Sequence, residues 1–311
     1  MIDLLLVAVG AVCLYFGGEG LVRGATQLAR TLGLSPLVIG LTVVAFGTSS
    51  PELAATLVAV FEGSPQVAVG NVLGSNIANV GLILGASALL QPLLAQASFL
   101  RREIPFMVAV SVLIIPMAAD GHYGRLDGLF LLALFALFLW VLLRKGEAPP
   151  MDLEVEDDGK PTKPVWVQLA MVVVGVVLLV VGAKVLITGA VSLARAVGLS
   201  EQVIGLSLVA LGTSLPELAA SLVAASHNEG DLVLGNVVGS NIFNVLLVLG
   251  TTVAIHPIPV LLSEFGRDLG VGLLFSIAVL PLLALGHPRR LSKREGTALL
   301  LGYVVYMWWI F

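Results

Sequence analysis

The chain has little charge and almost no cysteine. Of its 311 residues only 12% are charged, the net charge is −4, and Cys13 is the one cysteine. Soluble domains carry roughly 25% charged residues, so this composition and a mean hydropathy of +1.04 predict a membrane protein. A single cysteine excludes an internal disulfide and a cysteine-based metal cluster. No basic patch is interleaved with aromatic residues, so nucleic acid is not an expected partner.

The sequence also lacks the residue groups that catalysis requires. An enzyme would need a nucleophile paired with a base or a metal cluster, and neither is present. All four histidines fall in expected loops, where we expect them to be solvated: His122, His227, His256 and His287. We therefore expect no enzymatic activity, no cofactor and no obligatory protein partner.

Long hydrophobic runs are abundant. A transmembrane helix needs about 20 mostly apolar residues, and ten segments qualify: 2–30, 36–62, 65–91, 103–119, 125–144, 165–195, 201–226, 231–255, 265–285 and 294–311. No basic stretch precedes the first segment, which also has a repeat partner, so it is not a signal peptide. The predicted fold class is an all-α polytopic membrane protein with ten transmembrane helices.

The second half of the chain repeats the first. Residues 21–55 match 186–220 at 23 of 35 positions, and residues 70–79 match 235–244 at 8 of 10, both at an offset of 165. This predicts a five-helix repeat at 1–144, a linker at 145–164 and a second repeat at 165–311. Five is an odd number of spans, so the second repeat must be inverted. Secondary transporters typically combine inverted repeats with broken helices at the membrane midplane.

The linker between the repeats is rich in proline and acidic residues, and we expect it to be solvated. A calcium-sensing role is conceivable, but the ligand order of an EF-hand loop is missing. With the N-terminus outside, eleven lysines and arginines fall on inner loops and ends and three on outer ones. The positive-inside rule then predicts that both termini lie outside and that the linker is cytoplasmic.

One motif stands out within the hydrophobic runs. Gly40 to Glu52 reads Gly-Leu-Thr-Val-Val-Ala-Phe-Gly-Thr-Ser-Ser-Pro-Glu, and almost the same words return at residues 205–217. A carboxylate inside a membrane segment is expensive and by default marks a functional site. Pro51 and Gly47 should break the helix here and free backbone carbonyls. Such backbone is tolerated only where it is buried in protein or lines a cavity.

The two motifs supply an all-oxygen set of candidate ligands. Glu52 and Glu217 contribute carboxylates, and the same faces carry hydroxyls and amides at Thr48, Ser49, Ser75, Asn79, Thr213, Ser214, Ser240 and Asn244. Hard cations such as Ca²⁺ prefer oxygen ligands. A site charge of about −2 would be balanced by one Ca²⁺, two Na⁺ or two protons. An ionised empty site would be costly in a low dielectric, so this balance favours exchange.

Several other residues in and near the motifs have a structural interpretation. Glycines 70, 74, 235 and 239 are expected to let helices pack closely. Four asparagines could contact an ion but fit interhelical hydrogen bonding better: Asn71, Asn76, Asn236 and Asn241. Ser50 is replaced by leucine in the second motif and is not an expected ligand. Glu19 and Arg23 are expected to pair with each other near a helix end, with a transport role as the alternative.

The repeated words Gly-Thr-Ser-x-Pro-Glu and Gly-Ser-Asn-Ile-x-Asn resemble those of the sodium/calcium exchangers in the cation/calcium exchanger superfamily, prokaryotic type. The resemblance covers the whole chain and implies a core of motif-bearing helices, against which the long helices 2–30 and 165–195 slide. It implies calcium between Glu52 and Glu217 with the carbonyls of Thr48 and Thr213. Sodium would use those carboxylates, four serines and two carbonyls, with two asparagines bordering the site: Ser49, Ser75, Ser214, Ser240, Ala45, Ala210, Asn79 and Asn244.

One departure from the family pattern concerns Asn244, where several members carry aspartate. The absence of an aspartate at this position argues against potassium co-transport. The leading hypothesis is an antiporter of the cell (inner) membrane that exchanges sodium for calcium by alternating access and extrudes calcium. A proton/calcium antiporter is the alternative, although proton-coupled relatives commonly carry a glutamate in the second motif. A cation channel is a further alternative, which the inverted repeat argues against.

Overall fold

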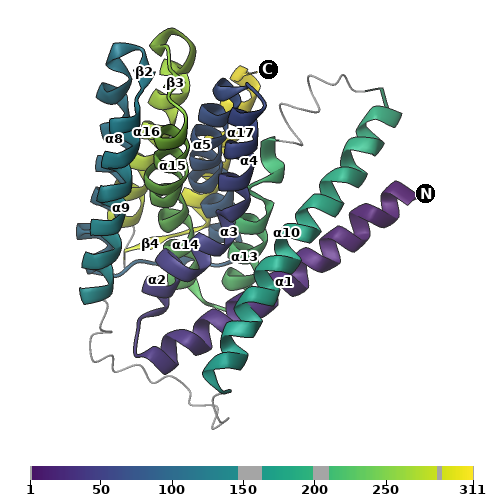
Figure 1. Ribbon diagram of the computed structural model, residues 1–311. Helices are drawn as coiled ribbons and strands as arrows, with labels where there is room; N and C mark the ends of the chain where they lie inside the picture. The colour runs from purple at the N-terminus through teal and green to yellow at the C-terminus, as the bar shows by residue number, and fades with distance from the viewer. Residues whose placement is uncertain (1, 146–162, 199–209, 286–288, 311) are drawn as a thin grey trace.

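The structure is a computed structural model that describes residues 2–145, 163–198, 210–285 and 289–310, and helices dominate it (Figure 1). The first half contains α1 (Ile2–Leu32), α2 (Pro36–Ile39), the π-helix η1 (Gly40–Val44), α3 (Ala45–Thr48), α4 (Ser50–Phe61), α5 (Pro65–Ala78), the π-helix η2 (Asn79–Leu84), α6 (Gly85–Leu90), α7 (Ala97–Arg101), α8 (Glu103–Met117), the 3₁₀ turn η3 (Ala118–Asp120) and α9 (Arg125–Lys145). The second half contains α10 (Val165–Ala196), α12 (Ala210–Gly212), α13 (Leu215–Ser226), α14 (Gly230–Phe243), the π-helix η5 (Asn244–Leu249), α15 (Gly250–Ile255), α16 (Leu262–Leu285) and α17 (Lys293–Ile310).

The predicted membrane spans agree with this helix pattern. Eight helical stretches are long and apolar enough to cross a membrane. A ninth, α13, is shorter because the helix breaks at Thr213 and Ser214, and residues 201–209 of its predicted span lie outside the described residues. The last, α17, begins with three charged residues before its apolar run. The fourth span starts earlier than expected, at Ala97, and is interrupted at Arg102 (φ −125°, ψ −63°). The predicted linker lies almost wholly outside the described residues, so its boundaries remain a proposal.

Two short ladders, which the sequence did not predict, connect the halves. β1 (Leu93–Leu94) pairs with β4 (Arg290–Leu291), and β2 (His122–Tyr123) pairs with β3 (Ile258–Pro259), both antiparallel. In Figure 1 the β2–β3 ladder is at the top and β4 lies lower in the molecule. Each ladder joins one strand from each half. Two residues are too few to leave a period-2 pattern in the sequence.

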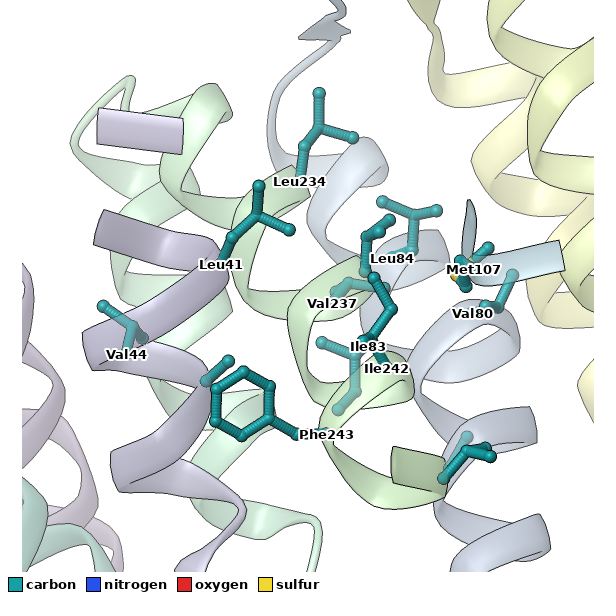
Figure 2. Packing of buried hydrophobic residues seen from close by; sticks show 14 of the residues in the cluster. Leu41, Val44, Val80, Ile83, Leu84, Met107, Leu234, Val237, Ile242 and Phe243 are labelled. Atoms are coloured by element: carbon teal, nitrogen blue, oxygen red, sulfur yellow. The ribbon is translucent and has the colours of Figure 1, made fainter. Parts of the chain in front are cut away.

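The helix α14 lies at the centre of the core. An 18-residue window of the α14–α15 span is 94% buried, the highest share among the membrane spans. Figure 2 shows its side chains Val237, Ile242 and Phe243 between those of η1 and η2. Close packing here depends on glycine, because a Cβ on Gly235 would lie 2.5 Å from the carbonyl oxygen of Leu37. The expected packing role therefore holds for Gly235 and Gly239. A Cβ on Gly70 or Gly74 would meet nothing within 4 Å among the described residues.

The long helices α1 and α10 form a separate pair that runs diagonally beside the core (Figure 1). They approach each other through small residues: a Cβ on Gly175 would lie 2.5 Å from the backbone nitrogen of Leu21, and one on Gly17 would lie 2.8 Å from that of Leu179. Contact between backbones at this distance fixes the two helices to each other by van der Waals packing. The pair is the structural counterpart of the two long helices expected from the sequence.

Candidate functional site

Both motif-bearing helices break where the sequence predicts. In the first half α3 ends at Thr48 and α4 begins at Ser50, with Ser49 at φ −83° and ψ 2°. In the second half α12 ends at Gly212 and α13 begins at Leu215, with Ser214 at φ −89° and ψ 3°. A proline follows in the first turn of each new helix and cannot donate to the carbonyl four residues back. The breaks therefore leave backbone oxygens free beside the carboxylates.

The two carboxylates are buried and are bonded by the opposite half of the chain. Glu52 and Glu217 are each 1% exposed. Ser214 Oγ donates to Glu52 Oε1 (3.4 Å), and Ser49 Oγ donates to Glu217 Oε1 (3.1 Å). Ser214 Oγ also lies 3.2 Å from Ser75 Oγ. Each half thus contributes the hydroxyl that contacts the carboxylate of the other, and the breaks from both halves form a single site.

Four asparagines form a reciprocal network beside the carboxylates. Asn79 Nδ2 donates to Asn241 Oδ1 (3.0 Å), and Asn244 Nδ2 donates to Asn76 Oδ1 (3.1 Å). Asn76 and Asn241 also donate to each other's backbone carbonyls, both at 3.4 Å. These contacts use one amide N–H of Asn79 and one of Asn244, and they leave the two side-chain carbonyl oxygens without a partner among the described residues. Asn76 and Asn241 therefore act as interhelical contacts, as the sequence favoured.

The site has more acceptors than donors. Five buried side-chain oxygens have no hydrogen-bond partner among the described residues: Glu52 Oε2, Glu217 Oε2, Asn79 Oδ1, Asn244 Oδ1 and Ser240 Oγ. No lysine, arginine or histidine hydrogen-bonds to either carboxylate in the described parts of the chain. Leaving buried acceptors unpaired costs free energy. Cations would satisfy these oxygens and balance the two charges, so the donor set fits hard metal ions.

The interhelical hydrogen bonds expected of Asn71 and Asn236 are confirmed, and the two hydroxyls that accept them were not predicted. Asn71 Nδ2 donates to Thr56 Oγ1 (3.1 Å), and in the second half Asn236 Nδ2 donates to Ser221 Oγ (3.0 Å). The same offset of 165 that relates the two asparagines also relates Thr56 to Ser221, and this was the available signal. These contacts fix the amides that receive bonds from the motif threonines.

The threonine hydroxyls donate to the side-chain amide oxygens of two asparagines, although Thr48 also lies within hydrogen-bonding reach of Glu217. Thr48 Oγ1 donates to Asn236 Oδ1 and Thr213 Oγ1 donates to Asn71 Oδ1, both at 3.2 Å. This leaves the backbone carbonyl of each threonine as its candidate ligand atom, as the resemblance implied. The Ala45 carbonyl already accepts from the backbone nitrogen of Ser49 (2.9 Å). Its twin Ala210 is the first residue of α12.

Two further expectations concern polar residues away from this centre. Ser50 Oγ donates to the carbonyl of Phe46 (2.7 Å), which agrees with its exclusion from the ligand set. Glu19 pairs with Arg23, as expected, and also contacts His227 Nε2 at 2.5 Å. His227 is therefore not merely solvated, because the end of α13 lies against α1. The Glu19 group joins the α1–α10 pair to the core.

Comparison with known proteins supports the same interpretation. The profile of the family described as "Sodium/calcium exchanger protein" matches residues 2–144 and 167–311. The chain is 40% identical to CaxA of Alkalimonas amylolytica over 100% of this chain and 99% of that protein. It is 31% identical to the sodium/calcium exchanger MaX1 of Methanosarcina acetivorans over 98% and 97% of the two chains.

A solved structure extends the likeness to three dimensions. The sodium-calcium exchanger NCX_Mj, soaked with zero Na⁺ and Ca²⁺, superimposes with a TM-score of 0.87 at 30% sequence identity. The match covers 99% of this chain and 99% of that one. The profile match alone spans nearly the whole sequence, and the inverted repeat, the broken helices and the paired glutamates agree with it. The chain is therefore a member of the sodium/calcium exchanger family, a polytopic membrane protein of cation/calcium exchange and not an enzyme.

Proposed function

We propose that this protein is a secondary active antiporter in which sodium entering the cell drives calcium out. The observation that carries the proposal is the set of five unpartnered buried oxygens, which includes one from each carboxylate. Two carboxylates give a charge of about −2, which one Ca²⁺ neutralises and which two Na⁺ neutralise equally. Because either set of bound ions balances the charge, the protein can change its conformation with calcium or with sodium bound. The empty ionised site would leave two buried charges unpaired, which is energetically unfavourable.

The proposed ligand assignment follows the contacts at the helix breaks. Calcium would bind between Glu52 and Glu217 and the carbonyls of Thr48 and Thr213. Sodium would use the carboxylates with the hydroxyls of four serines, the carbonyls of two alanines and the border of two asparagines: Ser49, Ser75, Ser214, Ser240, Ala45, Ala210, Asn79 and Asn244. The bonds from Ser49 and Ser214 to the carboxylates support this overlap, since one serine lies within reach of each acid. Overlapping sites make the two ions compete.

Movement of the α1–α10 pair against the core would provide alternating access. A cavity of about 240 Å³ lies between α10 and the broken helices and is lined by Pro51, Thr213, Pro216 and Lys184 among others. It reaches Pro51 and Pro216, which are next to the two carboxylates in the sequence, so we assign it as the passage for ions on one side. Sliding of α10 along the core would close it and open the equivalent space beside α1.

Transport by reconstituted protein tests the coupling. Proteoliposomes loaded with sodium and diluted into calcium should accumulate calcium, and vesicles loaded with choline should not. The matched arm imposes a pH gradient without sodium, because a proton/calcium antiporter would respond to that gradient alone. Calcium uptake driven by the pH gradient and indifferent to sodium would overturn the proposal. The proton-coupled alternative draws its support from the same two carboxylates, which could each carry a proton.

We also propose that the protein resides in the cell (inner) membrane with both termini outside. The distribution of lysine and arginine is the basis, with eleven on the inner side and three on the outer. In a Cys13→Ala background, a cysteine introduced at Asp157 in the linker should resist impermeant thiol reagents applied to whole cells, and one at His122 should react. The reverse labelling pattern would reverse the orientation and with it the direction of export.

A further inference from the structure

A crevice between α8 and α9 shares no residue with the candidate ion site. Its volume is about 290 Å³, and its lining is apolar except at one end: Arg102, Glu103, Phe106, Leu134, Leu137, Phe138, Val141 and Leu142. Leu137 is 52% exposed and Val141 37% exposed, so the crevice opens on the outer surface of the helices, which faces lipid. Its two charged residues lie where α8 begins, close to the end of α9.

The polar end of the crevice is incompletely satisfied. Arg102 donates through Nε (3.2 Å) and Nη2 (2.9 Å), and both bonds go to Glu103 Oε1. Glu103 Oε2 has no hydrogen-bond partner among the described residues, although the side chain is only 6% exposed. Burying a carboxylate oxygen without a hydrogen-bond donor costs free energy, because the charged group loses its contacts with water and gains none in return. The crevice therefore offers an acceptor to whatever occupies it.

The second half of the chain contains the equivalent place. Arg267 and Asp268 correspond to Arg102 and Glu103 at the offset of 165. For the last helix of each half the offset is 168 residues instead. The evidence is a repeated hydrogen bond, from Gly124 N to Asp127 Oδ2 (2.7 Å) in the first half and from Ser292 N to Glu295 Oε2 (2.8 Å) in the second. This register makes Tyr306 the counterpart of Phe138 and Trp309 the counterpart of Val141.

In the second half, Tyr306 and Trp309 provide contacts to Asp268 and Arg267 that the first half lacks. The Tyr306 hydroxyl donates to Asp268 Oδ1 (3.1 Å). The guanidinium of Arg267 lies 5.5 Å from the centre of the Trp309 ring. In the first half Phe138 has no hydroxyl to donate, and Val141 leaves the space that an indole would fill. The unpartnered oxygen therefore arises from phenylalanine in place of tyrosine, and the crevice from valine in place of tryptophan. A bound molecule could supply both the missing hydrogen-bond donor and the missing apolar volume.

We propose that this crevice binds a phospholipid whose headgroup carries a primary amine. An acyl chain would fill the apolar part in place of the indole, and the ammonium would donate to Glu103 Oε2 in place of the tyrosine hydroxyl. The phosphate would accept from Arg102, which has five N–H donors and spends two on Glu103. The Arg102–Glu103 pair has no net charge, so it matches a zwitterionic headgroup better than an anionic one. A quaternary ammonium has no N–H to donate.

The position in the membrane agrees with this occupant. Arg101 and Arg144 are exposed at the same end of the helices, and Arg144 lies 4.2 Å over the ring of Trp140. Aromatic and basic residues typically mark the level of lipid headgroups. Headgroup and chain would therefore meet the crevice at their normal depths in the bilayer.

Native mass spectrometry of the full-length protein tests the proposal. The protein is released from detergent with equal amounts of phosphatidylethanolamine, phosphatidylcholine and phosphatidylglycerol that share the same acyl chains. Wild type should retain phosphatidylethanolamine about tenfold more than the other two, as expected for one hydrogen bond to a charged group. Phe138→Tyr should supply the missing hydroxyl and abolish the preference. Val141→Trp should fill the crevice and reduce retention of all three lipids there.

The matched control is Asp268→Asn in the second half, which should leave the lipid preference unchanged. Glu103→Gln keeps the shape of the side chain but removes its charge, and should retain phosphatidylethanolamine and phosphatidylcholine equally. It provides a second route if either crevice-filling variant fails to fold, which thermal unfolding in detergent would reveal. Equal retention of the three lipids by wild type would overturn the proposal. So would a preference that survives Phe138→Tyr and Glu103→Gln in folded protein.

Discussion

The two halves of the molecule agree closely at the candidate ion site and differ in the packing around it. Both present a buried glutamate, a serine at the helix break and an asparagine with an unused oxygen, each pair related by the same offset. One residue before the site asparagines, Ala78 in the first half corresponds to Phe243 in the second, and Phe243 packs edge-on against Phe46 and Phe135. Ligand chemistry constrains the centre in both halves, whereas packing against different neighbours allows the rest to diverge.

The largest expected effect tests whether the two carboxylates are equivalent. Glu52→Gln and Glu217→Gln should each reduce calcium transport by about a hundredfold or more, because removing one charge leaves a divalent ion uncompensated in a buried site. Initial calcium uptake into proteoliposomes measures this. Glu62→Gln is the matched control, since Glu62 is an exposed acid at the end of the same helix α4. Near-normal flux in one of the two variants would show that the halves are not equivalent.

A tenfold effect is expected from the crosswise hydroxyls. Ser49→Ala and Ser214→Ala each remove a bond to a buried carboxylate and a proposed sodium ligand, so each should raise the sodium concentration for half-maximal exchange about tenfold. Ser50→Ala is the control, because the Ser50 hydroxyl donates to the Phe46 carbonyl and has no bond to a carboxylate in the part of the chain that the structure describes. A double-mutant cycle between Ser49 and Glu217 should show coupling, and one between Ser49 and Glu62 should not. Additive effects in the first cycle would contradict the pairing across halves.

Acid should produce a smaller, graded inhibition. Protons compete with cations for Glu52 and Glu217, so calcium flux at a fixed sodium gradient should fall several-fold as the pH drops from about 7 to about 5. Raising the calcium concentration should restore the flux, since the competition is for one site. The measurement is initial uptake across this pH range at two calcium concentrations. Inhibition that excess calcium does not relieve would place the titrating group elsewhere.

The smallest effect concerns the asparagines. Calcium transport by wild type should change less than twofold when potassium is replaced by choline, because Asn244 adds an oxygen but no charge. Asn244→Asp would raise the site charge to about −3 and should increase cation affinity, with potassium or a proton as an added passenger. Asn79→Asp is the matched change in the first half and should act similarly if the halves are equivalent. A wild-type flux that collapses without potassium would refute the charge argument.

Much of the site could be predicted from the sequence because it is encoded locally and repeated. Pro51 and Gly47 predicted the helix break, and the repeat offset of 165 residues identified Glu217 as the partner of Glu52. The pairing of Ser49 with Glu217, and of Ser214 with Glu52, could not be predicted, because it depends on how the inverted halves face each other. The π-helices that begin at Gly40, Asn79 and Asn244 lie in the buried core and were not predicted. The interruption at Arg102 does have a local signal, because Pro105 in the first turn of α8 cannot donate to the carbonyl of Arg101.

The crosswise bonds have a consequence for how such a protein is made and how it arose. Neither half can complete its carboxylate contact or either strand ladder alone, so half of the chain, once inserted, is an intermediate that waits for its complement. A cut in the linker should therefore be tolerated if both pieces are synthesised together. The same dependence suggests an evolutionary origin, in which one ancestral five-helix protein was inserted in both orientations and paired with its inverted copy. Gene fusion would then have joined two partners that already depended on each other.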